Sequence, residues 1–330
     1  MQGEIRRSYM WLPVCVLFLL AAIIAGLKYG SIPLSLSELL NILFHPQDAG
    51  LKSTVVWQLR LPRVALAALV GMSLAVSGSV FQAVLRNPLA DPYLLGVSGG
   101  AALGAVLALT FFSIQSYAVP VLAFSGALLA LLLVYLVARA HQAATHTLIL
   151  AGVMVGSLCT AVLMFLLLYS PSDPMRSALF WLAGNLSRTE AGWLPYAAAA
   201  CIGVILLLWA RASLLDVFTQ GEDVAADLGV DIGRERLLLL AGAGLLVAIA
   251  VALAGLVGFV GLVVPHAARL LWGAGHARLI PAAAIAGAGF LVAADTLART
   301  LLAPAEVPVG VITALVGAPF FLYLLRLRGR

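Results

Sequence analysis

Few residues in this chain have the type and spacing that could do chemistry in an apolar environment. Asp295 lies well within an apolar run, and Arg299 follows four residues later, so the two can neutralise each other on one helix face. His266 follows Pro265 in LVVPHAARLL and could serve a metal ion or a proton relay. A lone histidine near Arg269 is more typical of a packed structural side chain, and we predict no metal site and no catalytic residue.

The sequence also lacks a nucleotide site of its own. A phosphate-binding loop requires GxxxxGK[ST], and the only two lysines, Lys28 and Lys52, each follow a leucine. A carrier driven by protons would be expected to place more ionisable groups at membrane depth. Because it has neither a nucleotide site nor a catalytic group, the chain by itself is predicted not to be an enzyme.

These polar groups stand in a strongly apolar chain. Of 330 residues, 63% are hydrophobic and 10% are charged, and the mean hydropathy is +1.09. A soluble surface needs about 25% charged residues, so the composition predicts an all-α membrane protein with many spans. Ten apolar runs could cross a bilayer: 11–29, 62–84, 93–112, 118–138, 147–169, 193–210, 237–256, 257–274, 279–301 and 307–325. A tight turn at Gly255 and Gly258 must separate the seventh run from the eighth, and without it the count is nine.

The basic residues predict the orientation of these runs. Twelve of the nineteen Lys and Arg residues fall on the side that holds both termini, which the positive-inside tendency assigns to the cytoplasm. The first run lacks a convincing small-x-small cleavage site and is expected to remain as a helix. We predict a single transmembrane domain over 1–330, with its longest cytoplasmic loop at 211–236.

That loop gathers charge in GEDVAADLGVDIGRER at 221–236, where seven of sixteen residues are charged. Gly221 can break the chain, and Gly229 can close a short helix in a left-handed conformation. The acidic pair Glu222 and Asp223 suits the positive start of such a helix.

This short helix is predicted to have a small apolar face. Val224, Ala225 and Leu228 would share that face over about two turns. The alternative is a solvated loop that is merely charged.

Five stretches of the sequence match the pattern of a known family. Residues 57–104 read WQLRLPRVALAALVGMSLAVSGSVFQAVLRNPLADPYLLGVSGGAALG. Four more follow in order: LILAGVMVGSL at 148–158, LFWLAGNLS at 179–187, GLVGFVGLVVPHAARLLWG at 255–273 and PVGVITALVGAPFFLYLL at 308–325. The chain contains the motif RxPR followed by the motif NPLADPxxLGVSxG. In these motifs it resembles the FecCD/BtuC-type permeases, the membrane subunits of type II ABC importers for iron–siderophores, haem and cobalamin. The resemblance covers nearly the full chain.

The resemblance implies ten transmembrane helices in the bacterial inner membrane, in agreement with the independent count. It further implies a homodimer with a central translocation path, two cytoplasmic ABC ATPase subunits and a periplasmic substrate-binding protein. This chain would then bind no cofactor, because ATP and Mg²⁺ would belong to the ATPase subunits. Membrane lipid is an expected partner, and nucleic acid is not.

The resemblance also assigns a role to the charged loop. In the family, the loop after the sixth helix forms short coupling helices that sit in a cleft of the ATPase. The matching residues here are Glu222, Ala225, Ala226, Leu228 and Gly229. The apolar face would dock, and the charges would set the register.

Three arginines on the opposite side resemble the family's docking residues for the binding protein. Arg60 and Arg63 stand at the start of the second helix, and Arg299 lies near the outer end of the ninth. In the family these face glutamates on the two lobes of the binding protein, a role that suits the planar fork of a guanidinium. The alternative is that all three reach toward lipid headgroups.

Two further groups of residues have weaker assignments. Asn87, Pro88, Asp91 and Pro92 form a family hallmark that physically predicts a rigid cytoplasmic turn with capping side chains. The candidates for the translocation path, on the glycine-rich fifth helix, are Gly152, Met154, Gly156 and Thr160.

The sequence leaves the substrate open among iron–siderophore, haem and cobalamin, although family prevalence favours the first. Two rival functions remain as well. One is a secondary transporter that works alone and is not driven by ATP, and the other is a membrane scaffold or receptor with no transport path.

Overall fold

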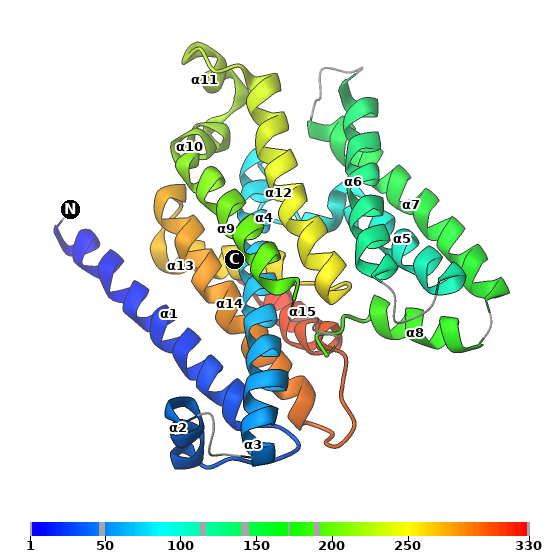
Figure 1. Ribbon diagram of the computed structural model, residues 1–330. Coiled ribbons are helices and arrows are strands. Elements are labelled where there is room, and N and C mark those ends of the chain that lie inside the picture. The colour runs from blue at the N-terminus through cyan, green and yellow to red at the C-terminus, as the bar shows by residue number, and fades with distance from the viewer. Residues whose placement is uncertain are drawn as a thin grey trace.

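Each of the ten apolar runs falls on a helix of its own in the computed structural model, which describes residues 2–45, 50–112, 117–139, 145–170, 172–187 and 192–328. These helices are α1 (Gln2–Lys28), α4 (Leu61–Val84), α5 (Val97–Phe111), α6 (Ala118–Arg139), α7 (Thr145–Tyr169), α9 (Leu194–Ala210), α12 (Ile232–Ala254), α13 (Val260–Trp272), α14 (His276–Thr300) and α15 (Val309–Arg328) (Figure 1). By length and composition, five helical stretches could each cross a membrane, α9 with α10 forms a bent sixth, and four further apolar helices are shorter.

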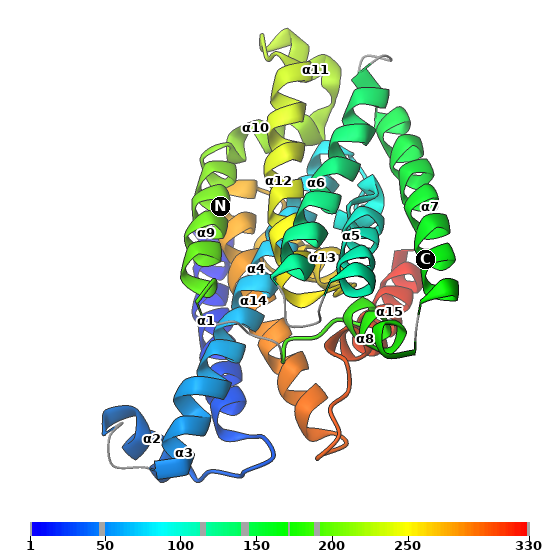
Figure 2. The ribbon, with the colours of Figure 1, turned by 45° about the vertical axis from the view of Figure 1, so that its right-hand side comes forward.

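Shorter helices join these spans. They are α2 (Leu36–Phe44), α3 (Gly50–Thr54), the π-helical η1 (Val55–Arg60), the 3₁₀ turn η2 (Pro92–Leu95), α8 (Ser172–Leu182), α10 (Ala212–Gln220) and α11 (Glu222–Asp227). Figures 1 and 2 place α11 at one end of the bundle, whereas α2 and α3 lie at the opposite end. These are called here the α11 end and the α2 end.

The loop predicted at 211–236 is mostly helical. Its residues form α10 and α11, and α12 already begins at Ile232. Polar and charged side chains break the apolar pattern here, so the sequence predicts only one of these helical pieces.

The centre of the bundle is α4, which contacts α14, α12 and α13 along its length. Glycines bring these backbones together. A methyl group at Gly71 would lie 2.2 Å from the carbonyl oxygen of Gly287, and one at Gly78 would lie 1.8 Å from that of Gly261. Since lipid gives helices no hydrophobic reason to associate, such close packing of small residues holds the spans together.

The break between α12 and α13 confirms that these are two separate helices. Gly255 has φ +69°, as the predicted turn requires, but the second residue with positive φ is Phe259 at +68° rather than Gly258. A methyl group at Gly317 would lie 2.5 Å from Cβ of Phe259, so the backbone of α15 packs tightly against this strained residue. Tertiary packing therefore holds a conformation that the local sequence disfavours.

We predict that Gly78→Ala destabilises the protein by about 1–3 kcal/mol, because the new methyl group must push α4 away from α13. Gly203→Ala is the matched control, since no atom lies within 4 Å of the methyl group that it adds. Thermal unfolding of both purified variants in detergent compares them. Equal melting temperatures would show that the contact between Gly78 and Gly261 contributes nothing.

Candidate functional site

The predicted short helix in the charged segment is present as α11. It begins at Glu222 and ends at Asp227, with Gly221 at φ +131° before it and Gly229 at φ +75° after it. The N–H of Gly229 donates to the carbonyl oxygen of Ala226 at 2.9 Å. Both glycines thus terminate the helix as the sequence predicts.

Glu222 attaches α11 to two long helices. Its Oε1 lies 2.5 Å from Nη2 of Arg236, a buried residue in the first turn of α12. It also lies 3.6 Å from Nη2 of Arg86, which follows the end of α4. One carboxylate therefore ties the tip of the protein to α4 and α12.

The predicted apolar face of α11 is only partly correct. Val224 and Leu228 are exposed by 38% and 64%, whereas Ala225 is fully buried against the rest of the chain. The side chain of Ala226 is exposed, as is Gly229. Ala225 thus anchors α11 inward, and Val224 with Leu228 forms an exposed apolar surface.

The preceding helix, α10, is fastened to α14. Asp216 accepts hydrogen bonds from the backbone N–H of His276 at 2.9 Å and pairs with its ring Nδ1 at 2.6 Å. Arg211, just before α10, pairs with Glu235 in α12. The whole segment from α10 to α12 is therefore held by side-chain bonds to long helices.

The turn after α4 is rigid, as its composition predicts. The side chain of Asn87 accepts from the N–H of Leu89 at 2.9 Å, and Asp91 accepts from the N–H of Tyr93 at 2.8 Å to cap η2. Burial raises the pKa of Asp91, and the bond from Tyr93 opposes that rise. The Tyr93 hydroxyl then donates to the carbonyl oxygen of Val257 and accepts from its N–H, both at 3.1 Å. The turn is thus joined to the break between α12 and α13.

At the α2 end, two of the three predicted docking arginines cap α1. The last carbonyl oxygens of a helix have no partner within it. Nη1 of Arg60 donates to Leu27 at 2.7 Å and to Lys28 at 3.0 Å, and Nη2 of Arg299 donates to Gly26 at 3.0 Å. Both side chains are buried, and neither reaches toward headgroups as the alternative proposed.

Arg63 is the third arginine, and its surroundings differ. Its guanidinium pairs with buried Asp295 at 2.9 Å and with exposed Glu306 at 2.9 Å. Asp295 also pairs with Arg299 at 3.0 Å, which confirms the predicted i,i+4 pair. The structure therefore brings the three arginines into one region, and Arg63 is the member with a partner at the surface.

Three of the four path candidates line a groove of about 630 Å³ between η2 and α7. Gly152, Gly156 and Thr160 form part of its wall, whereas Met154 is 65% exposed and lies outside it. A methyl group at Gly152 would lie 2.2 Å from the carbonyl oxygen of Leu94, so glycine is required for α7 to pack there.

One face of α7 has no partner within the described chain. Its exposed apolar side chains include a series at three- or four-residue spacing: Leu150, Met154, Leu158, Val162, Phe165 and Leu168. In both ribbon views α7 lies at the edge of the bundle (Figure 2). The groove is therefore open on the side that this face borders.

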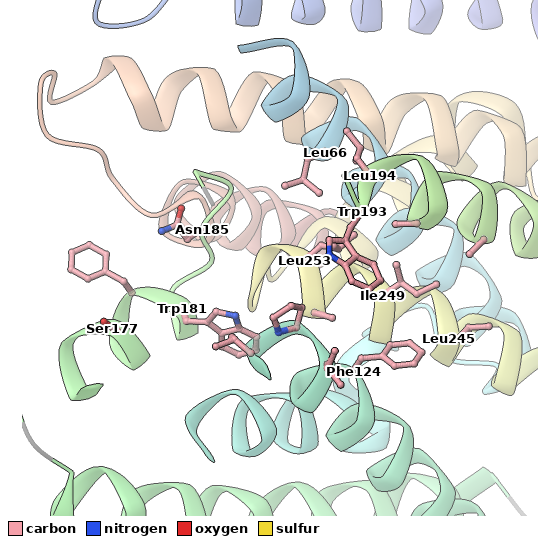
Figure 3. Close-up of a pocket in the computed structure, with 17 residues that line it drawn as sticks. Leu66, Phe124, Ser177, Trp181, Asn185, Trp193, Leu194, Leu245, Ile249 and Leu253 are labelled. Carbon is pink, nitrogen blue, oxygen red and sulfur yellow. The ribbon is translucent and has the colours of Figure 1, made fainter. Parts of the chain in front are cut away.

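A separate cavity of about 480 Å³ lies between α4, α6, α8, α9 and α12. Figure 3 shows Trp181, Trp193 and Phe124 around it, with Ser177 and Asn185 as its polar residues. None of the lining residues that the structure describes is charged. Within the described residues no group of three His, Cys, Asp or Glu side chains could hold a metal ion. His266 is buried with its ring edge-on to Phe321 at 6.2 Å, as a packed histidine should be.

Comparison with known proteins identifies the family. The model of the FecCD transport family matches residues 17–327. The chain belongs to this family.

Relatives in the FecCD family include curated permeases. The cobalamin import system permease protein BtuC of Halobacterium salinarum is 48% identical over 287 residues, which cover 85% of this chain and 76% of that protein. The vitamin B12 import system permease protein BtuC of Escherichia coli O139:H28 is 38% identical over 329 residues, which cover 98% and 97%.

A solved structure shows the same fold. It is described as an inward-facing conformation of a metal-chelate type ABC transporter, and it covers 96% of this chain and 99% of its own. The TM-score is 0.87 at 33% identity. The FecCD-family chain is therefore an all-α, multi-pass membrane permease with the fold of an ABC importer.

Some residues of these sites have no signal in the sequence. Glu306 and Arg86 each pair with a side chain far away in the chain, whereas Arg236 pairs with Glu222 inside the charged segment 221–236. Only the i,i+4 spacing of Asp295 and Arg299 makes one such pair visible beforehand.

We predict that Asp295→Asn lowers stability by about 3–5 kcal/mol, because two enclosed guanidinium groups lose their shared counter-ion. Glu306→Gln, which removes an exposed carboxylate from the same cluster, should cost at most about 1 kcal/mol. Thermal unfolding in detergent checks both. Similar losses in the two variants would show that burial of Asp295 is not what makes it important.

Proposed function

We propose that this FecCD-family permease imports a cobalamin-type corrinoid across the bacterial inner membrane as a homodimer. Two ABC ATPase subunits would drive it, and a periplasmic binding protein would deliver the substrate. The observation that carries the proposal is the near-complete alignment, at 38% identity, with a vitamin B12 import permease. The cobalamin permease at 48% identity supports the same substrate class.

The chemistry of the groove agrees with a large cargo of little net charge. Its lining consists mainly of glycine, hydroxyl and apolar side chains, and none of the lining residues in the described part of the chain is Lys, Arg or His. Haem, with its carboxylates, and those ferric siderophores that are anionic would find no cation among these lining residues. A corrinoid presents mostly amides and an apolar ring edge, which such a wall can contact without counter-charges.

A second copy of the chain would complete the groove. The exposed apolar face of α7 borders the open side, and pairing it with another α7 would turn two half-grooves into one path. The path would then run along the dimer axis, and neither chain alone would enclose it.

The positive-inside count supports an orientation with the α11 end in the cytoplasm. The α2 end, with Arg63 and Glu306, would then face the periplasm and the binding protein. The ATPase would contact α11 through Val224 and Leu228.

The ion pairs of α11 suggest how a movement of the ATPase subunits would be transmitted to the translocation path. When the ATPase subunits close, they would pull on α11, and the pairs of Glu222 with Arg86 and Arg236 would pass that pull to α4 and α12. The 24 residues of α4 span about 36 Å. Glycine contacts keep α4 against α13 and α14, so these helices would move together. The far end of α4 carries Arg63.

The rival function, a secondary transporter that acts alone, is less well supported. Such a carrier needs titratable or ion-binding groups that face its path, whereas the described residues of the groove include one carboxylate, Asp91, which already caps η2. Uptake by the purified permease without any ATPase would favour this rival.

Reconstitution tests the substrate. Proteoliposomes that contain the permease with its ATPase and binding protein should take up cyanocobalamin only when ATP is present. Excess cobinamide, which keeps the corrin ring, should compete, whereas a ferric siderophore or haem should not. Uptake of a siderophore or haem in place of the corrinoid would overturn the substrate assignment and leave the importer assignment standing.

Gly229→Pro tests the coupling role. Proline cannot adopt φ +75° and has no N–H to donate to Ala226, so α11 should lose its end while the membrane bundle stays intact. We expect ATP hydrolysis to continue and uptake to fall at least about tenfold. Gly233→Ala is the control, because Gly233 lies within the first turn of α12, where its methyl group would meet only Asp231 at 3.7 Å. Normal uptake by Gly229→Pro would remove the coupling role of α11.

A further inference from the structure

The guanidinium of Arg63 is shared between two carboxylates of unlike exposure. Nε contacts both oxygens of Asp295 at 3.0 and 3.2 Å, and Nη2 lies 2.9 Å from its Oδ1. Nη1 donates to both oxygens of Glu306 at 3.0 and 2.9 Å. Nε and Nη2 of Arg63 therefore pair with Asp295, and Nη1 pairs with Glu306.

The two carboxylates differ in how firmly they are held. The side chain of Asp295 is 1% exposed within α14 and is also paired with Arg299. That of Glu306 is 46% exposed in the connection between α14 and α15. The backbone next to it is fixed, because the N–H of Val307 donates to the carbonyl oxygen of Ala298 at 3.0 Å. The Glu306 side chain can therefore leave Arg63 without unfolding the loop.

The cluster is electrically balanced as it stands. Arg63 and Arg299 contribute two positive charges, and Asp295 and Glu306 contribute two negative charges. An acidic partner that approached would find the guanidinium of Arg63 already paired while Glu306 stays in place, and the third arginine, Arg60, buried against the end of α1. Once Glu306 moves aside, the cluster carries one positive charge at the surface.

We propose that Glu306 masks Arg63 in the free permease and that a carboxylate of the docking protein takes its place. Asp295 holds the guanidinium in the orientation that presents Nη1 outward, and the incoming carboxylate accepts the hydrogen bonds that Glu306 releases. This inference rests on the proposed function in one respect, the delivery of substrate by a binding protein at the α2 end. It assigns the contact to Arg63, because Arg60 and Arg299 are engaged in capping α1.

The exchange is energetically feasible. An exposed ion pair contributes at most about 1 kcal/mol, so displacing Glu306 requires little. A like-for-like exchange of carboxylates also keeps the guanidinium paired throughout, so that no buried charge is left alone. Glu306 thereby lowers the affinity for any partner that cannot supply a carboxylate at this position.

The test measures the affinity of the binding protein for the complete importer, permease with ATPase subunits, in detergent or nanodiscs. We expect Glu306→Gln to bind about two- to five-fold more tightly than the wild type, mostly through faster association, because the competitor is gone. Arg63→Gln should weaken binding. In the double variant Arg63→Gln with Glu306→Gln, the gain from the glutamate change should disappear.

Glu38→Gln is the matched control for charge alone. Glu38 is also an exposed glutamate at the α2 end, and it pairs with exposed Lys52 at 2.5 Å. The hydrogen bond from Lys52, followed by those from Ser35, lowers the pKa of Glu38 to about 2, so this residue is an anion at the pH of the assay. Its replacement should leave the affinity for the binding protein unchanged within about twofold.

The outcomes separate the inference from the proposed function. Equal affinity of wild type and Glu306→Gln, with Arg63→Gln still weakened, overturns masking and leaves docking at Arg63 intact. A gain that persists in the double variant, or that Glu38→Gln reproduces, means general charge repulsion and also overturns masking. Absence of binding in every variant, with correctly assembled importer, removes the binding protein from the proposed function itself.

Discussion

Inside a bilayer, every backbone polar group must find its partner within the protein, and this constraint shapes the whole molecule. Helices meet it along their length, and the exceptions are their ends and breaks. At the end of α1 the last carbonyl oxygens are taken up by the N–H of Tyr29, by Arg299 and by Arg60. At the break between α12 and α13, the Tyr93 hydroxyl satisfies both backbone groups of Val257. The first role of these arginines and of Tyr93 is therefore structural, because they form hydrogen bonds with backbone groups that lack a partner within a helix.

The same constraint explains why charge collects at the two ends. At the α2 end a balanced cluster around Asp295 joins α4 to α14, and at the α11 end Glu222 joins the short helix to α4 and α12. The first cluster contacts Arg63 in α4, and the second contacts Arg86, two residues after α4 ends. Because α4 packs through glycine against its neighbours, it forms a stiff connection between the two surfaces where partners are proposed to bind.

The wall of the groove differs in composition from the two charged ends. Glycine at 152 lets α7 approach η2 closely, and hydroxyl side chains remain along the wall that is proposed to contact cargo. In the proposed path, a wall with Asp91 as its one charged residue among those described would hold a large, nearly neutral cargo weakly, so that cargo could leave as easily as it enters. The driving force must then come from a partner that moves the helices.

The sequence determined the fold class, the ten helices and the two ends of α11, because apolar run length and glycine placement are local signals. It also predicted the pair of Asp295 and Arg299, since four residues make one helical turn. Only the tertiary structure decided that Ala225 faces inward, that Arg60 caps α1, and that Phe259 rather than Gly258 has the second positive φ of the turn between α12 and α13. Those features, like the pairing of Arg63 with Glu306, depend on side chains that meet from distant parts of the chain. The spacing of residues along a sequence does not indicate which distant groups share a buried counter-ion, because packing in the folded protein brings those groups together.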